Sequence, residues 1–172
     1  MNHSKVLVTG GAGYIGSHAV ASLLSSSRHV VVVDKDKEAC ENLLKIFQNN
    51  KNLTVHCTDI DNDVWMDGIL ENEKPTACFH FAGYSSIQES IKDPLKYYNN
   101  NTAKTINLLK RLNRNGVHRF IFASTAAVYG NPESPQSITE ITPCKPINAY
   151  GNSNLMIEFI LKQMFDTIPA FE

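Results

Sequence analysis

Residues 5–16 read Lys-Val-Leu-Val-Thr-Gly-Gly-Ala-Gly-Tyr-Ile-Gly, and this stretch decides the fold of the chain. Its apolar first half predicts a buried strand, and its glycine-rich second half predicts a sharp turn into a helix. Gly10, Gly13 and Gly16 stand three residues apart. At this spacing the first glycine permits a tight turn, the second lets the backbone approach a pyrophosphate, and the third lets the helix pack close to the sheet. We therefore predict that the helix begins at an anion-binding site.

A second apolar run, residues 30–33, ends in Asp34, about 20 residues after the glycine cluster. A glycine triplet alone also fits an ordinary turn, but an acid at this position is typical of a site that binds the ribose hydroxyls of an adenosine. A carboxylate there repels a 2′-phosphate, which favours NAD over NADP. Lys35 and Lys37 weaken that preference slightly. The two stretches together predict a dinucleotide site that includes Asp34 and Lys35.

The length of 172 residues predicts a single dinucleotide-binding domain over residues 1–172. The formal net charge of −1 gives no reason to expect nucleic acid or an anionic membrane as a partner. No apolar run reaches the ~20 residues of a membrane span, and the amino terminus runs into a strand without a signal-peptide pattern. The four cysteines lack the close spacing of metal sites. We expect no metal, and reduced structural thiols in a cytoplasmic protein.

Strand and helix patterns alternate along the rest of the chain. Further strands are predicted at 29–34, 53–57, 77–81 and 119–123. Helices are predicted at 14–27, at 36–48, after a cap at Asp61, at 93–113 and at 148–165. A segment rich in Pro, Ser and Thr spans 124–147, and loops of that length are more often functional than idle. This alternation predicts a doubly wound α/β fold whose parallel sheet has the strand order 3-2-1-4-5.

In such a sheet, ligands bind beyond the carboxyl ends of the strands. After the third strand, Asp59 and Ile60 fit an adenine, because the carboxylate can accept from the amino group while the isoleucine packs on the ring. A capping aspartate and a core isoleucine remain the alternative. After the fourth strand, Ala82 and Gly83 leave a passage of small side chains for a cofactor. The amides at 99–101 point in different directions on a predicted helix, so that one of them can face the site.

Five stretches together resemble the UDP-glucose 4-epimerase family of extended short-chain dehydrogenase/reductases. They cover nearly all of the chain in the family's order, but only the front half of the family's length. The resemblance therefore implies an NAD-binding Rossmann fold truncated after the fifth strand and the following helix, without the family's sugar-binding domain. The stretches are Val-Thr-Gly-Gly-Ala-Gly-Tyr-Ile-Gly-Ser-His (8–18), His-Phe-Ala-Gly (80–83), Pro-Leu-Lys-Tyr-Tyr-Asn-Asn-Asn (94–101), Ala-Ser-Thr-Ala-Ala-Val-Tyr-Gly (123–130) and Ala-Tyr-Gly-Asn-Ser (149–153).

The resemblance implies a bound NAD that removes hydride from C4 of a UDP-sugar and returns it to the other face of the 4-keto sugar. Tyr150 would be the general base for the 4-hydroxyl, and Thr125 would hydrogen-bond the same oxygen. Ala126 and Ala127 stand where related dehydratases carry an Asp-Glu pair, which argues against dehydration. The implied cofactor contacts are Tyr14, Ile15, Asp34, Asp59, Ile60, Phe81, Ala82, Gly83 and Asn100.

The chain departs from the family at two lysines. The family motif Tyr-x-x-x-Lys here reads Tyr150 followed by Asn154. Residue 154 lies one helical turn after Tyr150 and faces the same site, but an amide carries no charge to support a phenolate. The amide can still hydrogen-bond a ribose hydroxyl, so Tyr150 and Asn154 stay among the expected cofactor contacts. Ser85 stands where these epimerases commonly place a second lysine on the cofactor.

Three functional hypotheses follow from these departures. The first is a UDP-hexose 4-epimerase that acts on a UDP-sugar, and the second is a catalytically inactive module that binds NAD. The third is a remnant that folds poorly and binds nothing. We also expect self-association, either through the helices or through an exposed apolar edge of the fifth strand at residues 120–122.

Overall fold

A computed structural model describes residues 4–131 and 138–172. These residues form two compact units. The first, here called the sheet unit, comprises the chain through Ala82 together with Asn107–Ala123 and Ala170–Glu172. The second, here called the helical unit, comprises Gly83–Ile106 and Ser124–Pro169. Part of the predicted loop at 124–147, residues 132–137, lies outside the described residues.

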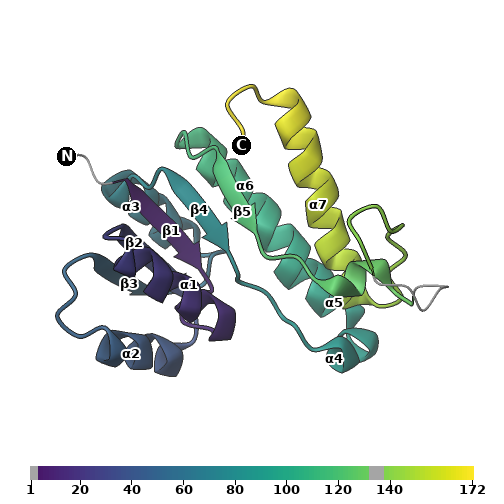
Figure 1. Cartoon of the computed structure of the whole chain (residues 1–172), viewed down its shortest axis with the longest axis horizontal. Coiled ribbons are helices and arrows are strands. Elements are labelled where there is room, and N and C mark those ends of the chain that lie inside the picture. The colour runs from purple at the N-terminus through teal and green to yellow at the C-terminus, as the bar shows by residue number, and fades with distance from the viewer. Residues whose placement is uncertain (1–3, 132–137) are drawn as a thin grey trace. The chain divides into compact units, whose positions relative to one another are not determined.

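The sheet unit is built on five parallel strands in the order β3-β2-β1-β4-β5, as predicted (Figure 1). The register places Thr9 opposite both Val33 on β2 and His80 on β4, so the carboxyl ends of these central strands lie side by side. This is the edge where doubly wound sheets bind their ligands. The strands are β1 (Lys5–Thr9), β2 (His29–Asp34), β3 (Leu53–Cys57), β4 (Ala77–His80) and β5 (Arg119–Phe122).

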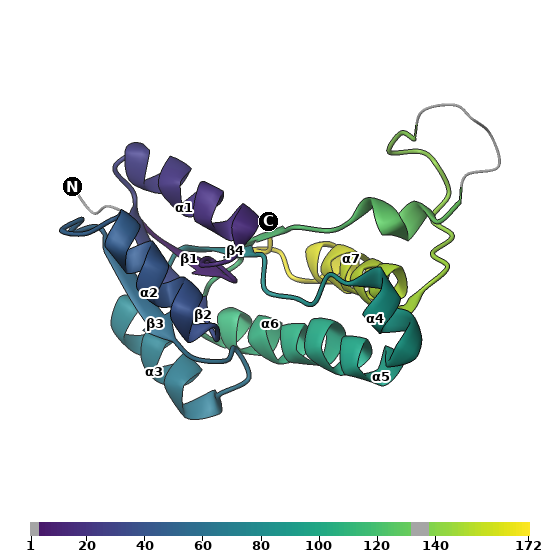
Figure 2. The same cartoon turned by 90° about the horizontal axis from the view of Figure 1, so that it is seen from below.

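Helices cover both faces of this sheet. On one face, α1 (Tyr14–Ser25) and α2 (Lys37–Ile46) bury Val20, Leu24 and Leu43 in one cluster with alternate residues of β1 and β2. The buried residues of α3 (Asp63–Glu73) and α6 (Lys104–Arg114) include Met66, Ile69, Leu70, Leu108 and Leu112. Figure 2 shows α1 and the end of α6 on opposite sides of the sheet. Burial on both faces explains why β2 is a continuous run of valines rather than an alternating pattern.

The first turn of α3 corrects the predicted cap. The side chain that accepts the hydrogen bond from Trp65 N, at 3.3 Å, belongs to Asn62 and not to Asp61. The Asp59 carboxylate accepts from Asp61 N at 3.0 Å, which forms a turn and delays the helix by one residue. Asp61 instead accepts a hydrogen bond from Asn107 on α6.

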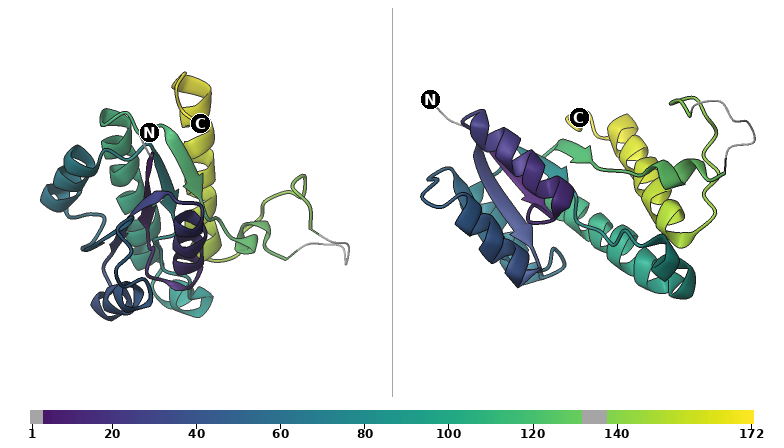
Figure 3. Two further views of the ribbon diagram at one scale, coloured as in Figure 1. Left: turned by 60° about the vertical axis from the view of Figure 1, so that its left-hand side comes forward. Right: turned by 60° about the horizontal axis from the view of Figure 1, so that its bottom comes forward.

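The helical unit contains α4 (Ile87–Lys92), α5 (Pro94–Tyr97), the start of α6 and α7 (Ala149–Thr167), with a 3₁₀ turn, η2, at Ala126–Tyr129. Helix α7 packs against both α4 and α5 (Figure 3). The single helix predicted at 93–113 is instead α5 and α6 joined by a π-helical segment, η1, at Tyr98–Ala103. Such insertions within α-helices are frequent at functional sites.

Helix α4 was not among the predicted elements. Its cap follows a recognisable pattern, because the Ser86 hydroxyl accepts from Glu89 N at 3.2 Å. A serine followed three residues later by a glutamate is the capping-box signal. The helix escaped prediction because it is only six residues long and too short for an apolar stripe to be seen.

The edge of β5 is partly covered by the chain itself, which corrects the expectation of an open apolar edge. Glu172 donates its N–H to the His118 carbonyl at 2.8 Å and accepts from Phe120 N at 2.9 Å, the pattern of a parallel pair. The Arg119 guanidinium adds an ion pair to the Glu172 carboxylate at 2.9 Å. Phe120 is buried, while Ile121 is 54% exposed.

Within the described ranges, no helix is long and apolar enough to cross a membrane.

Candidate functional site

The glycine loop after β1 requires two of its glycines for steric reasons. Gly10 has φ +68°, and a Cβ there would lie 2.5 Å from Ala82 N at the end of β4. A Cβ on Gly16 would lie 2.1 Å from the Gly10 carbonyl oxygen. Gly10 N also donates to the Val33 carbonyl at 2.8 Å. The loop is therefore pressed against β2 and β4, as the glycine spacing predicts for the turn and for close helix packing.

Gly13 differs from these two positions. A Cβ there would meet the Gly10 carbonyl oxygen at 3.4 Å and nothing closer, so the fold itself leaves room at this position. Gly13 is the N-cap of α1 and has no side chain to cap the first N–H groups. Tyr14 and Ile15, which follow it, are 84% and 61% exposed. An uncapped helix N-terminus beside an open backbone position suits a phosphate group.

Asp34 lies at the end of β2 and is held against the glycine loop. Its Oδ2 accepts from Ala12 N at 3.1 Å, and its Oδ1 accepts from Asp36 N at 3.1 Å. These two hydrogen bonds from backbone N–H groups fix the carboxylate beside the glycine loop, with which it is predicted to bind the same dinucleotide. Lys35, the next residue, is exposed.

The residues after β3 and β4 that the sequence predicts as cofactor contacts have structural partners of their own. Ile60 is 7% exposed, and the Asp59 carboxylate forms the turn before α3. This is the arrangement expected of a turn aspartate and a core isoleucine. Phe81 packs on the core cluster of β1 and β2, and Ala82 lies against Gly10. The sheet unit thus brings together the glycine loop, Asp34 and Ala82.

A buried histidine that the sequence analysis did not single out supports this edge of the sheet. His80, the last residue of β4, is 1% exposed, and its Nδ1 lies 2.6 Å from the Thr9 hydroxyl. Burial lowers the pKa of His80 to about 4, so the imidazole is neutral at pH 7. Its ring lies against Phe120 and Phe122. In the sequence, His80 is marked only as a polar residue within a predicted apolar strand.

In the helical unit, the first turn of α7 carries Tyr150 against the turn that carries Thr125. Asn148 caps α7 by accepting from Gly151 N at 2.8 Å, and Thr125 caps η2 by accepting from Ala127 N at 3.1 Å. A Cβ on Gly151 would lie 2.5 Å from the Ala127 carbonyl oxygen, so the two turns are in direct backbone contact. The two residues predicted to contact the substrate hydroxyl therefore come from adjoining turns.

Asn154 is buried at 6% exposure one turn after Tyr150. Its Nδ2 group donates to the Tyr150 carbonyl oxygen at 2.8 Å. The amide thus holds the backbone of the first turn of α7 and brings no positive charge to the phenol.

Tyr97 packs behind Tyr150 and was also missed by the sequence analysis. It is fully buried, and its ring meets that of Tyr150 edge-on, with 6.3 Å between centroids. Its hydroxyl donates to Glu89 at 2.8 Å, and Lys96 donates to the same carboxylate at 2.6 Å. Burial and the bond to Glu89 raise the pKa of Tyr97, while the bonds from Lys96 and Tyr97 lower that of Glu89. The hydrogen bonds to Glu89 hold the Tyr97 ring in place against one side of the Tyr150 ring.

The three asparagines of η1 have different surroundings. Asn99 is exposed, Asn100 is half-buried and Asn101 is buried. The Asn101 amide accepts from Tyr84 N at 2.8 Å and donates to the Tyr84 carbonyl at 2.9 Å, and it also accepts from Asn100 Nδ2 at 3.0 Å. A Cβ on Gly83 would lie 3.5 Å from the Asn101 oxygen. Asn101 therefore orders the segment around Gly83, and Asn100 is anchored beside it.

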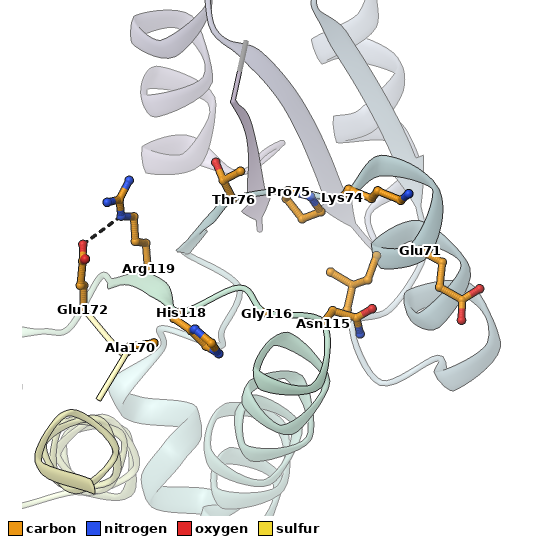
Figure 4. Close-up of a pocket in the computed structure, with 11 residues that line it drawn as sticks. Glu71, Lys74, Pro75, Thr76, Asn115, Gly116, His118, Arg119, Ala170 and Glu172 are labelled. Atoms are coloured by element: carbon orange, nitrogen blue, oxygen red, sulfur yellow. Dashed lines mark hydrogen bonds and ion pairs between the residues drawn. The ribbon is translucent and has the colours of Figure 1, made fainter. Parts of the chain in front are cut away.

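An open cavity in the sheet unit lies away from these residues. It is bounded by the segments that lead into β4 and β5, at the edge opposite the carboxyl ends of the strands (Figure 4). Its lining residues are Leu70, Glu71, Lys74, Pro75, Thr76, Asn115, Gly116, His118, Arg119, Ala170 and Glu172. Among the described residues, no cluster of His, Cys, Asp and Glu side chains is suited to a metal ion.

Comparison with known proteins bears out the resemblance found in the motifs. The chain is 43% identical over 161 residues to the UDP-glucose 4-epimerase of Lactobacillus helveticus, covering 91% of this chain and 46% of that protein. It is 39% identical over 161 residues to the UDP-glucose 4-epimerase of Bacillus subtilis, covering 92% of this chain and 47% of that protein. The chain therefore spans about half the length of the curated relatives it matches.

Solved structures give the same result. The UDP-Glc/GlcNAc 4-epimerase of Campylobacter jejuni superposes with a TM-score of 0.92 at 37% identity, covering 98% of this chain and 51% of that one. The UDP-glucose 4-epimerase of Bifidobacterium longum, solved in complex with NAD+ and UDP, superposes with a TM-score of 0.89 at 34% identity, with the same coverage of both chains. The fold is thus the Rossmann fold of these epimerases. The model of the family described as GDP-mannose 4,6 dehydratase matches residues 7–171, and the chain belongs to that family.

Proposed function

We propose that this chain binds NAD in the manner of the UDP-glucose 4-epimerases, as one dinucleotide-binding domain. The observation that carries the proposal is the junction of the glycine loop with Asp34, in which Ala12 N donates to the carboxylate at 3.1 Å. The open position at Gly13 leaves room for a pyrophosphate next to the uncapped start of α1. The residues present therefore fit the dinucleotide.

Each part of the site would hold a different part of NAD. The start of α1 would bind the pyrophosphate through backbone N–H groups, and Asp34 would accept from the adenosine ribose hydroxyls. The two hydrogen bonds that Asp34 accepts from described residues both come from backbone N–H groups, and a carboxylate held there repels a 2′-phosphate, which supports NAD over its 2′-phosphorylated form. Further contacts in the proposal are Tyr14, Ile15, Lys35, Asp59, Ile60, Phe81, Ala82, Gly83, Asn100, Tyr150 and Asn154.

The reaction we propose is interconversion of UDP-galactose and UDP-glucose, at a rate far below that of a Tyr-x-x-x-Lys enzyme. NAD supplies the hydride acceptor in such a reaction. Tyr150 would take the proton of the sugar 4-hydroxyl, and Thr125 would hold that oxygen. A tyrosine with a pKa of ~10 is ionised in only about one molecule in a thousand at neutral pH, and loss of an activated base costs on the order of 10²–10⁴ in rate.

The second candidate function is NAD binding without turnover. The burial of Asn154 and its bond to the Tyr150 carbonyl support it, because this side chain cannot supply the charge that a phenolate requires. The two candidate functions share the NAD-binding site and differ only in whether the chain converts a UDP-sugar. The four free cysteines are consistent with the reducing cytoplasm for either one.

Titration calorimetry with NAD tests the binding proposal. We expect Asp34→Ala to weaken NAD binding about ten- to a hundredfold, the loss of hydrogen bonds to a charged group. Glu38→Ala, which removes the same charge from an exposed position on α2, should leave affinity within about twofold. Equal affinity in wild type and Asp34→Ala would remove the proposed role of the carboxylate. Conversion of UDP-galactose by the wild type then separates the two candidate functions.

A further inference from the structure

Two cysteines lie beside Asp34. Cys57 is the last residue of β3 and pairs in register with Asp34 on β2. Cys40 lies on α2, and its thiol donates to the Asp34 carbonyl oxygen at 3.6 Å. Cys40 and Cys57 are therefore both immediate neighbours of Asp34. The proposed function uses neither thiol.

The two thiols differ in accessibility. Cys57 is exposed, whereas Cys40 is 3% exposed. Burial, followed by the charges of Cys57 and Asp34, raises the pKa of Cys40 to about 12. Because the thiolate is the reactive form and the oxidant must reach it, Cys57 is the thiol that reacts first. Cys40 is then the neighbouring thiol that can react with the oxidised Cys57.

We propose that Cys40 and Cys57 form a reversible redox pair, which a hydroperoxide oxidises to a disulfide that weakens binding at Asp34. The Cys57 thiolate attacks one oxygen of hydrogen peroxide, the O–O bond breaks, and the second oxygen leaves as water with the Cys57 proton. The Cys57 sulfenic acid has then lost two electrons to the peroxide. The Cys40 sulfur attacks the Cys57 sulfur, the S–O bond breaks, and the hydroxyl leaves as water with the Cys40 proton. Two thiols and one peroxide thus give one disulfide and two waters.

The link to Asp34 follows from the positions of the two sulfurs. A disulfide bond of about 2.05 Å is much shorter than any non-bonded contact between two sulfurs, so its formation draws the α2 segment and the end of β3 together. It also removes the S–H donor from the Asp34 carbonyl, which Thr58 N shares at 2.9 Å. The Asp34 side chain, which holds Ala12 N, lies on the backbone that must adjust. The effect on ligand binding rests on the proposed NAD site, whereas the disulfide itself does not.

The first test maps the bond. The full chain is treated with hydrogen peroxide, its remaining thiols are alkylated, and its peptides are analysed by mass spectrometry. We expect a Cys40–Cys57 cross-link that dithiothreitol reverses, and we expect Cys144→Ser, which removes the other exposed thiol, to form the same cross-link. Cys40→Ser should instead stop at oxidised Cys57. Recovery of alkylated Cys40 from fully oxidised wild-type protein would overturn the proposal.

The second test reads the effect at Asp34 in two ways. Hydrogen exchange should speed up at the Ala12 amide in the oxidised wild type, and NAD affinity by calorimetry should fall roughly ten- to a hundredfold. Cys57→Ser should show neither change after the same treatment. A disulfide that leaves both Ala12 exchange and NAD affinity unchanged would overturn the link to Asp34. If the reduced protein binds no NAD, the proposed function fails. The cross-link and the exchange rate of the Ala12 amide still test whether Cys40 and Cys57 form a redox pair that affects Asp34.

Discussion

In the proposed function, Asn154 is the residue that limits catalysis. Its amide is buried and donates to the Tyr150 carbonyl, so the phenol lacks the positive charge that a lysine would supply. We expect Asn154→Lys to raise the rate of UDP-galactose conversion by about 10²–10⁴, because the ammonium stabilises the phenolate. Initial rates with NAD and UDP-galactose measure the effect.

Gln163→Lys is the matched control for this substitution. It adds the same charge to an exposed position of α7 and should leave the rate unchanged. If Asn154→Lys remains as slow as the wild type while still binding NAD, the missing charge is not what limits the chemistry.

His80 makes folding stability depend on pH. Burial lowers its pKa from the ordinary 6.5 to about 4, so the unfolded chain binds the proton more tightly than the native state does. The stabilising contribution of the neutral form is complete above pH 6.5 and is lost as the pH falls toward 4. A shift of this size corresponds to roughly 3 kcal/mol.

Urea unfolding at several pH values checks this prediction. The free energy of unfolding of the wild type should fall by about 3 kcal/mol more than that of His80→Asn between pH 6.5 and pH 4. His18→Asn, at an exposed position, should keep the full wild-type dependence. Parallel curves for the wild type and His80→Asn would show that His80 is not the titrating group.

At the scale of the element, the start of the glycine loop does not tolerate a side chain at Gly10. Gly10→Ala should lower the free energy of unfolding by at least ~2 kcal/mol, because alanine is strained at φ +68° and its Cβ meets backbone atoms of Phe81 and Ala82. Gly68→Ala on α3 has no neighbour within 4 Å and should raise stability by about 0.5–1 kcal/mol. Chemical denaturation measures both, and a Gly10→Ala variant as stable as wild type would contradict the loop geometry.

The sequence predicted these elements where a long periodic pattern existed. The strand order and the strand at 29–34 were correct because parallel strands buried on both faces form continuous apolar runs. The helix ends were less accurate, since α1 ends at Ser25 rather than at residue 27. Helix α4 and the π-helical segment were missed, because six-residue elements carry too little periodicity and their backbone type depends on packing.

Within the candidate site, the residues that could be predicted from the sequence are those marked by a local motif. Gly10 and Asp34 are marked by spacing alone, and the structure places them together. Tyr97 and His80 could not be assigned in the same way. Their roles come from contacts with Tyr150 and Thr9, which are distant in the sequence and are brought together by the fold.

At the scale of the whole molecule, α7 offers the exposed apolar side chains through which we expect the chain to self-associate. Met156, Phe159 and Phe165 are 48%, 59% and 64% exposed. Burial of such side chains between two copies would stabilise a dimer. Light scattering at high concentration should give about twice the 19.2 kDa mass of the chain, and Phe159→Asp should return it toward the monomer. Gln163→Asp is the exposed control on the same helix, and a wild-type monomer at every concentration would contradict the prediction.

In the proposed function, the glycine loop and Asp34 bind a dinucleotide. A ligand that binds only the native state must stabilise it, by about 2.7 kcal/mol at a hundred times its dissociation constant. The most direct measurement is therefore the melting temperature of the purified chain with and without NAD, for the wild type and for Gly13→Ala, whose Cβ the fold can accommodate but a pyrophosphate cannot. We predict that both proteins melt cooperatively at similar temperatures without ligand, and that NAD raises the melting temperature of the wild type alone. A well-folded wild type whose melting temperature NAD does not change would contradict the account.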